Sequence, residues 1–206
     1  MMKIIALMAQ KGGVGKTTLA VHLAVQAGGD AILLDADPQG SAKLWHEQRS
    51  ADAPLLAQAE AGNLKSLLKS AEGEGAETVI IGAPPHNEKI TGDIAALADL
   101  VVIPCRPTIL DLNAIGSTVA TVLHRGARGV VVLSACPPRR TLEANIVSEA
   151  RKFISKYGLP VYPGQVTQRV AFSHSLIGGQ AVTEFEPKGK AADEIRKLWN
   201  WLRKEM

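Results

Sequence analysis

Apolar residues in this chain gather into six short runs, several of them almost unbroken in valine, isoleucine and leucine. Short runs without polar alternation are typical of strands that are buried on both faces of a parallel sheet. We therefore predict strands at residues 3–9, 31–35, 78–81, 100–105, 129–136 and 159–162.

Between these runs, apolar residues recur every three or four positions, which predicts helices. The predicted helices cover residues 16–27, 40–49, 64–71, 87–98, 110–124, 142–157 and 191–204. This alternation favours the α/β class: a doubly wound, mostly parallel sheet with helices on both faces. A chain of 206 residues without repeats or an evident linker is expected to form one domain, residues 1–206. Its ligand is expected beyond the carboxyl ends of the strands.

The first predicted strand leads directly into Lys11-Gly12-Gly13-Val14-Gly15-Lys16-Thr17-Thr18. A glycine-rich loop between a strand and a helix holds nucleotide phosphates, because backbone N–H groups and the helix N-terminus turn toward the anion. In such a P-loop, Lys16 reaches the β- and γ-phosphates and the Thr17 hydroxyl binds Mg²⁺. The alternative is a glycine-rich turn with two solvated lysines, and the order of strand, loop and helix favours the P-loop.

This loop has Gln10 where the usual pattern has glycine, and a second lysine at Lys11. The form K-G-G-x-G-K-T resembles the deviant Walker A motif of the ParA/MinD group of ATPases, and the compact chain resembles the small plasmid-partition ParA type. The resemblance implies a P-loop NTPase fold and a homodimer with ATP and Mg²⁺ between the subunits. Lys11 would reach the partner's nucleotide, as an arginine finger adds positive charge in phosphoryl transfer.

Two carboxylates, Asp35 and Asp37, close the second predicted strand in D-A-D-P-Q-G. Carboxylates at alternate positions of a strand end suit a Mg²⁺–phosphate site. The segment also resembles switch I of the ParA family, D-x-D-P-Q. That resemblance implies that Asp35 holds a Mg²⁺-bound water and that Asp37 orients or activates the attacking water. The alternative is an Asp-Pro turn with a helix cap.

The third strand departs from the family pattern. Relatives commonly have D-T-P-P or D-x-A-P here, with a Walker B-like aspartate that supports Mg²⁺, whereas this chain has Gly82-Ala83-Pro84-Pro85. Glycine supplies neither charge nor acceptor, and such supporting residues typically change metal affinity or activity about 10–100-fold. Three explanations stay open: an engineered change, a natural one for which Asp35 and Asp37 suffice, or a protein that binds ATP and hydrolyses it slowly.

Two further segments resemble the family's nucleotide contacts. Residues 98–107 resemble the strand A-D-x-V-I-I-P-x-x-P, which implies a contact from Pro104, and residues 166–169 resemble the loop that covers the base. We interpret Asp111, just beyond, as a cap or surface contact near the partner subunit. The resemblance implies nucleotide binding by Gly12, Gly13, Val14, Gly15, Lys16, Thr17, Thr18, Pro104, Thr167 and Gln168, catalysis by Lys11, Lys16 and Asp37, and metal binding by Thr17 and Asp35.

Basic residues gather around one predicted helix and the loop after it: Arg139, Arg140, Arg151, Lys152, Lys156 and Arg169. ParA-type proteins use basic residues in this part of the chain to bind DNA without sequence preference. Phosphate contacts need only suitably spaced positive charge. The alternative is a solvated helix face, and the net charge of +3 favours a nucleic-acid partner only mildly.

The last predicted helix carries Ile195, Leu198, Trp199 and Leu202 on one face, with lysines and arginines beside them. A basic amphipathic helix with tryptophan can lie on a membrane, as in MinD-like relatives. The same stripe is what a helix needs to pack on a sheet, and we favour packing. A membrane partner is therefore not expected.

The remaining composition adds few constraints. Cys105 and Cys136 end apolar runs and are expected to be buried thiols, and the missing C-x-x-C pair disfavours a metallocluster carrier. No apolar run approaches the ~20 residues of a membrane span, so we expect a cytoplasmic protein. The resemblance to ParA-type proteins implies nucleoid association. The predicted function is a ParA-like ATPase that positions plasmid, chromosome or other cargo with a ParB-like or adaptor partner. Its hydrolysis is expected to be slow, and Gly82 counts against fast turnover. The alternatives are a non-hydrolysing nucleotide-binding scaffold and a MinD-like membrane-surface ATPase.

Overall fold

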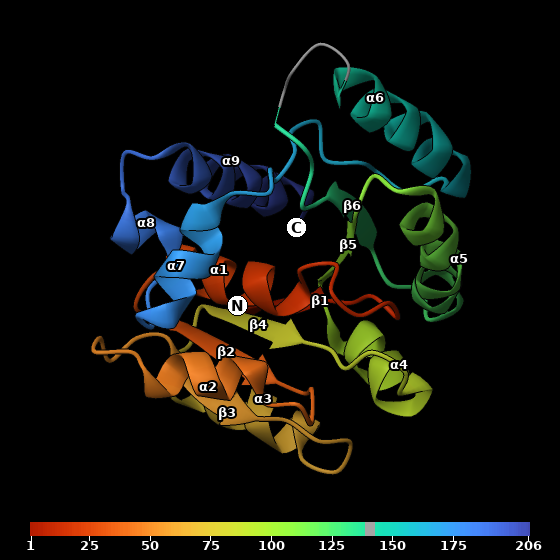
Figure 1. The fold of residues 1–206 in the computed structure, drawn as a ribbon. Coiled ribbons are helices and arrows are strands. Elements are labelled where there is room, and N and C mark those ends of the chain that lie inside the picture. The colour runs from red at the N-terminus through yellow and green to blue at the C-terminus, as the bar shows by residue number, and fades with distance from the viewer. Residues whose placement is uncertain (139–142) are drawn as a thin grey trace.

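The computed structural model describes residues 1–138 and 143–206, and the described strands form one parallel sheet (Figure 1). The strands are β1 (Lys3–Leu7), β2 (Ala31–Asp35), β3 (Leu55–Gln58), β4 (Thr78–Gly82), β5 (Leu100–Cys105) and β6 (Gly129–Leu133). Their order across the sheet is β3-β2-β4-β1-β5-β6, and every pairing is parallel. The predicted fold class is thus confirmed.

Helices follow the strands in the expected alternation. They are α1 (Lys16–Ala27), α2 (Ser41–Glu47), α3 (Leu64–Gly73), α4 (Glu88–Leu97), α5 (Ile109–His124), α6 (Glu143–Ile154), α7 (Val170–Ile177), α8 (Val182–Phe185) and α9 (Lys190–Glu205). A short 3₁₀ turn, Ser155–Tyr157, extends α6. Within residues 1–138 and 143–206, none of these helices has the length and apolar character that crossing a membrane requires.

Each central strand serves two hydrophobic layers, because successive side chains point to opposite faces. In β1, Ile5 and Leu7 pack on the side of α1, α2 and α9, whereas Ala6 packs on the side of α3, α4, α5 and α6. Figure 1 shows α4, α5 and α6 gathered on one side and α1, α7, α8 and α9 on the other. Burial on both faces explains why the central strands are almost continuously apolar.

The structure differs from the sequence-based expectation in three places. The edge strand β3 was not predicted, because its four residues are partly exposed and show no extended apolar run. The strand predicted at 159–162 is wrong: this segment makes only an isolated bridge, Val131 to Val161. Pro160 and Pro163 lack N–H donors and so prevent a longer ladder. Helices α7 and α8 were missed because both are short, with glycines between them.

Candidate nucleotide site

The glycine-rich loop joins β1 to α1 and is held at both ends. Gly13 and Gly15 have φ of 73° and 93°, the left-handed region that favours glycine, and Gly15 caps α1. The Gln10 N–H donates to Thr118 Oγ1 at 3.3 Å, and the carbonyl of Val14 accepts from Ser134 Oγ at 2.7 Å. The loop is therefore fixed to α5 on one side and to the end of β6 on the other.

A cavity of about 480 Å³ opens at this carboxyl edge of the sheet. The loop and the start of α1 form one wall, and residues that follow β6 form the opposite wall. Of the residues predicted from the sequence, the cavity brings together Gly12, Gly13, Gly15, Lys16, Thr17, Thr18, Asp37, Thr167 and Gln168. Segments that are 150 residues apart in the sequence thus meet around one space, where parallel α/β sheets bind ligands.

The two lysines of the loop have different surroundings. Lys16 is only 7% exposed, and its Nζ donates to the carbonyl of Lys11 at 3.4 Å. Within residues 1–138 and 143–206, no carboxylate lies within 4.0 Å of this ammonium. Burial lowers the pKa of Lys16, and the charge of Asp37 opposes this shift. The structure thus leaves a desolvated cation facing the cavity.

Lys11 instead points to helix α5. Its Nζ lies 2.9 Å from Oδ1 of Asp111, whose other oxygen accepts a hydrogen bond from the Thr108 hydroxyl. Thr108 caps α5 and accepts the Asp111 N–H. Asp111 was expected to be a cap or a surface contact, and at 5% exposure it is not a surface contact. The cap is Thr108, and the Asp111 carboxylate accepts from the Thr108 hydroxyl and holds Lys11.

The two carboxylates after β2 are oriented by backbone groups. Asp35 is buried, and its two oxygens accept from the N–H groups of Asp37 at 3.1 Å and Ala42 at 3.2 Å. Burial raises the pKa of Asp35, while these hydrogen bonds oppose the shift. Asp37 Oδ1 accepts from the Gln39 N–H at 3.0 Å, so the turn expected as the alternative is present, whereas the N-cap of α2 is Gly40. Asp37 also lines the cavity.

Gly82 lies beside Asp35 in the parallel register of β2 and β4. A Cβ at Gly82 would lie 3.8 Å from Asp35 Oδ1 and 3.9 Å from the Leu34 carbonyl oxygen, which is ordinary contact. The backbone at Gly82 is not in the left-handed region. Neither space nor conformation therefore requires glycine here, and a side chain at this position would point to Asp35.

Four residues of the predicted nucleotide and metal site do not line the cavity. Lys11, Val14 and Pro104 lie instead around a void of about 10 Å³, and Asp35 is buried at 3% exposure. Among the described residues, no group of three or more histidine, cysteine or acidic side chains is arranged to hold a metal by itself. A metal here would therefore need ligands beyond these side chains.

Sequence reasoning missed several cavity residues. Arg106 follows β5 at the same edge, and its Nη2 lies 3.7 Å from the position of a Cβ on Gly13. Its place directly after an apolar strand was a usable signal. Phe172 was missed with helix α7. Ala135 lines the wall after β6 with φ of 46°, a conformation that costs energy for alanine and is common near functional sites.

Among the four described residues of the predicted DNA surface, two serve internal contacts and two are exposed. Arg151 donates to the carbonyl oxygens of Tyr162 and Gly164, and Arg169 pairs with Glu194 at 2.7 Å beside the cavity. Lys152 and Lys156 are exposed on α6 and the turn after it. Arg139 and Arg140 lie outside the described residues.

The apolar stripe of α9 is buried, as we favoured. Ile195, Leu198 and Leu202 are 0% exposed and Trp199 is 7% exposed, all in the core layer that also contains α1. Both cysteines are buried and unpaired with each other, as expected. Burial raises the pKa of the Cys105 thiol to about 12.

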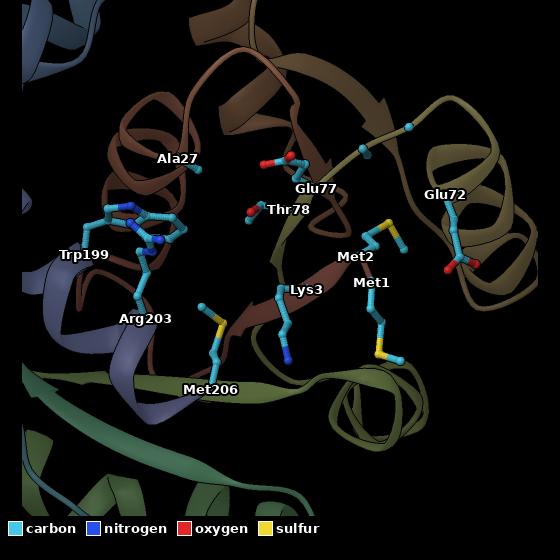
Figure 2. A pocket seen from close by; sticks show the side chains of 12 residues that line it. Met1, Met2, Lys3, Ala27, Glu72, Glu77, Thr78, Trp199, Arg203 and Met206 are labelled. Atoms are coloured by element: carbon cyan, nitrogen blue, oxygen red, sulfur yellow. The ribbon is translucent and has the colours of Figure 1, made fainter.

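A second cavity, of about 600 Å³, lies at the amino edge of the sheet (Figure 2). Figure 2 shows Trp199 and Arg203 of α9, and Met206 directly after it, facing Lys3 at the start of β1, with Met1 and Met2 beyond it. None of the predicted site residues lines this cavity.

A parallel sheet with a P-loop between β1 and α1, facing a cavity at the carboxyl edge, defines a P-loop nucleotide-binding protein. Residues 5–182 match the CobQ/CobB/MinD/ParA nucleotide binding domain. The chain belongs to this family, and the motif at Lys11–Lys16 is that of the ParA/MinD-type P-loop ATPases.

Named relatives agree with this assignment. Maintenance of carboxysome distribution protein A of Gloeobacter kilaueensis is 31% identical over 99% of this chain and 94% of its own length. Chromosome-partitioning ATPase Soj of Thermus thermophilus is 26% identical over 94% of this chain and 92% of its own. Among solved structures, the cell division ATPase MinD of Pyrococcus furiosus aligns with a TM-score of 0.81 at 18% identity, over 100% of both chains. MinD complexed with Mg-ADP from Pyrococcus horikoshii gives 0.73 at 16%, over 98% and 96%.

Proposed function

We propose that this chain is an ATP-dependent dimerising switch that binds DNA without sequence preference and positions plasmid, chromosome or other cargo. The observation that carries the proposal is the desolvated, carboxylate-free ammonium of Lys16 at the mouth of a glycine-rich loop. A buried cation without a counter-ion costs free energy unless an anion completes the site. Partition and carboxysome-distribution names among the relatives support the cargo-positioning part.

The residues present fit a nucleotide with Mg²⁺. The N–H groups of Gly13 and Gly15 and the start of α1 suit phosphate, and Lys16 would neutralise it. Thr17 would offer its hydroxyl to Mg²⁺, and Asp35 would hold a metal-bound water. Because burial disfavours the charged forms of both Lys16 and Asp35, a phosphate–cation pair relieves both. Bound Mg²⁺ would supply charge neutralisation during phosphoryl transfer. Asp37, on the cavity wall, would orient the attacking water.

Lys11 would act only in the dimer. In the single chain, Asp111 holds its ammonium at 2.9 Å, so Lys11 must leave this carboxylate to reach a partner's phosphates. Two γ-phosphates between subunits would offer each Lys11 a stronger partner, and hydrolysis would remove it. The exposed apolar side chains of Ile109 and Leu110, 63% and 71% exposed at the start of α5, suit burial in such a dimer.

The DNA contact is assigned to Lys152 and Lys156, which are exposed four positions apart. Arg151 and Arg169 serve internal contacts, so we do not include them. A dimer doubles a small basic surface, which explains why DNA affinity would follow ATP binding.

The test measures oligomeric state and DNA binding together, without nucleotide, with ADP, and with ATP and Mg²⁺, each at two salt concentrations. We expect a dimer and salt-sensitive DNA binding with ATP and Mg²⁺ only. Lys11→Ala should abolish the ATP-dependent dimer. Lys152→Glu with Lys156→Glu should keep the dimer and weaken DNA binding at least about tenfold.

The matched control for the DNA variant is Lys65→Glu with Lys69→Glu, the same charge change at the same spacing on the exposed face of α3. This control should bind DNA nearly as well as the wild type. Equal losses in the two double variants would mean that net charge, and not the α6 surface, governs the binding. A dimer that ignores DNA at both salt concentrations would contradict the DNA part of the proposal.

A non-hydrolysing nucleotide-binding scaffold is the second candidate, because Gly82, beside Asp35 in the sheet, supplies no carboxylate. It predicts the ATP-dependent dimer without measurable turnover. The MinD-like membrane alternative has less support, because the apolar face of α9 is buried in the core.

A further inference from the structure

Glu194, in the second turn of α9, is bonded to the far wall of the candidate nucleotide cavity. Its Oε2 accepts from the Thr167 N–H at 2.9 Å. Its Oε1 accepts from the Thr167 hydroxyl at 2.9 Å and from Arg169 Nη2 at 2.7 Å. The side chain is 16% exposed. One carboxylate therefore receives three charge-assisted hydrogen bonds from two residues that line the cavity.

The segment that Glu194 holds is bonded on its other side to the chain at the end of β6. Residues 163–169 contain no helix, but the Val166 N–H donates to the Leu133 carbonyl at 2.9 Å, and the Val166 carbonyl accepts from the Cys136 N–H at 3.0 Å. The Gln168 N–H donates to the Cys136 carbonyl at 2.7 Å, and Gln165 Nε2 reaches Thr167 Oγ1 at 3.3 Å. The segment thus has β6 on one side and Glu194 on the other, with the cavity in front of it.

The position of Thr167 and Gln168 in the cavity determines which part of a bound nucleotide they would contact. Phosphates belong at the glycine loop, so the nucleoside extends toward Thr167 and Gln168 on the opposite wall. Glu194 makes none of the described hydrogen bonds to residues 10–18. Its influence should therefore be confined to the nucleoside end of the site.

We propose that Glu194 is a positioning residue that sets the nucleoside wall of the site, so that α9 forms part of the nucleotide-binding apparatus. The proposal rests on the proposed function, because it takes the cavity ligand to be a nucleoside triphosphate. Burial of the α9 stripe against α1 makes this helix a rigid support for the carboxylate. Pre-organisation of the wall lowers the ordering cost that the ligand must otherwise meet.

The experiment compares two ligands by titration calorimetry of the full chain: Mg²⁺-ATP and Mg²⁺-tripolyphosphate, which lacks the nucleoside. Glu194→Ala should raise the Kd for ATP about tenfold, since the lost hydrogen bonds are to a charged group, and change the Kd for tripolyphosphate less than about twofold. Asp193→Ala is the matched control at the adjacent position, because among the described residues the Asp193 carboxylate pairs with exposed Lys197 and not with the cavity wall. It should leave both Kd values unchanged.

Two gentler variants keep the test decisive if Glu194→Ala does not fold. Glu194→Gln keeps the side-chain volume and removes the charge, and Thr167→Val removes one of the hydrogen bonds. Both should lose ATP affinity selectively, by less than Glu194→Ala, with faster amide exchange at residues 166–169. Equal losses for the two ligands would overturn the proposal, because they indicate general destabilisation. An unchanged ATP Kd in every variant would also overturn it, while the proposed function would stand. Wild-type protein that binds neither ligand would overturn both.

Discussion

The two edges of the parallel sheet each carry a cavity, and they differ in what lines it. The amino-edge cavity is the larger, about 600 Å³ against about 480 Å³. Its charged side chains, such as Glu77 and Arg203, are exposed to solvent (Figure 2). At the carboxyl edge, Lys16 and Asp35 are 7% and 3% exposed. The two volumes are similar, so what distinguishes the cavities is that the charged side chains at the carboxyl edge are buried, whereas Glu77 and Arg203 at the amino edge are exposed.

This difference shows what marks a site in a P-loop fold. Solvated charges at the amino edge need no ligand, because water already screens them. Lys16 and Asp35 are held where burial shifts the pKa of each toward its neutral form. The free energy stored in these two positions is recovered only when a ligand of complementary charge binds.

The largest expected effect is the difference in ATP affinity between two single variants, one that removes a lysine at the carboxyl edge and one that removes a lysine at the amino edge. Lys16→Ala should weaken ATP binding about 100-fold, because the phosphates lose a buried cation. Lys3→Ala, at the amino-edge cavity, should change the affinity less than about twofold. Titration with a fluorescent ATP analogue measures both. Similar losses in the two variants would erase the distinction between the edges.

A carboxylate introduced at position 82 should have a smaller effect. It should lower the stability of the ligand-free protein and raise the ATPase rate in the presence of Mg²⁺ and ATP. Gly82→Asp places a second charge near Asp35, so without ligand the protein should lose about 1–2 kcal/mol of stability. With Mg²⁺ and ATP, turnover should rise about tenfold at limiting Mg²⁺. Thermal unfolding and a Mg²⁺ titration of the ATPase rate measure these changes.

Gly82→Asn separates charge from shape at that position, and it should reproduce neither change. A Gly82→Asp rate equal to that of the wild type would mean that the glycine does not limit hydrolysis, and Asp35 with Asp37 would then suffice.

The third prediction concerns the stability contributed by His22, a buried residue of α1. Its Nδ1 accepts from the Val182 N–H at 3.3 Å, and burial lowers the pKa of His22 to about 3, against a weaker opposing effect of Glu184. The unfolded chain binds the proton first, near pH 6.5, so stability falls as the pH is lowered from about 6.5 toward 3. Between pH 7 and pH 5 the loss from this group should be about 2 kcal/mol.

Denaturant unfolding at both pH values checks this, with His22→Asn as the comparison, since asparagine keeps an acceptor and does not titrate in this range. The variant should be less stable at pH 7 and lose less on acidification. A parallel decline of both proteins would assign the acid sensitivity to other groups.

The sequence-based predictions succeeded where chemistry and periodicity coincide. The glycine loop, its lysines and the two carboxylates stand directly after apolar strands, and parallel strands bring their carboxyl ends to one edge. The predictions failed where an element is short or has no clear apolar periodicity. The edge strand β3 and helices α7 and α8 are stabilised by packing rather than by pattern, and with α7 the sequence missed Phe172 on the cavity wall.

By itself, the sequence determined the order of the central strands and helices along the chain, the P-loop, and the family that this loop indicates, because these depend on neighbouring residues. Only the tertiary structure decided which charges have partners. Lys11 meets Asp111 across 100 residues, Glu194 meets Thr167 across 27, and Lys16 meets no carboxylate among the described residues. Such pairings depend on where the folded backbone brings distant side chains together and how far it excludes water from them, and neither is encoded in local spacing.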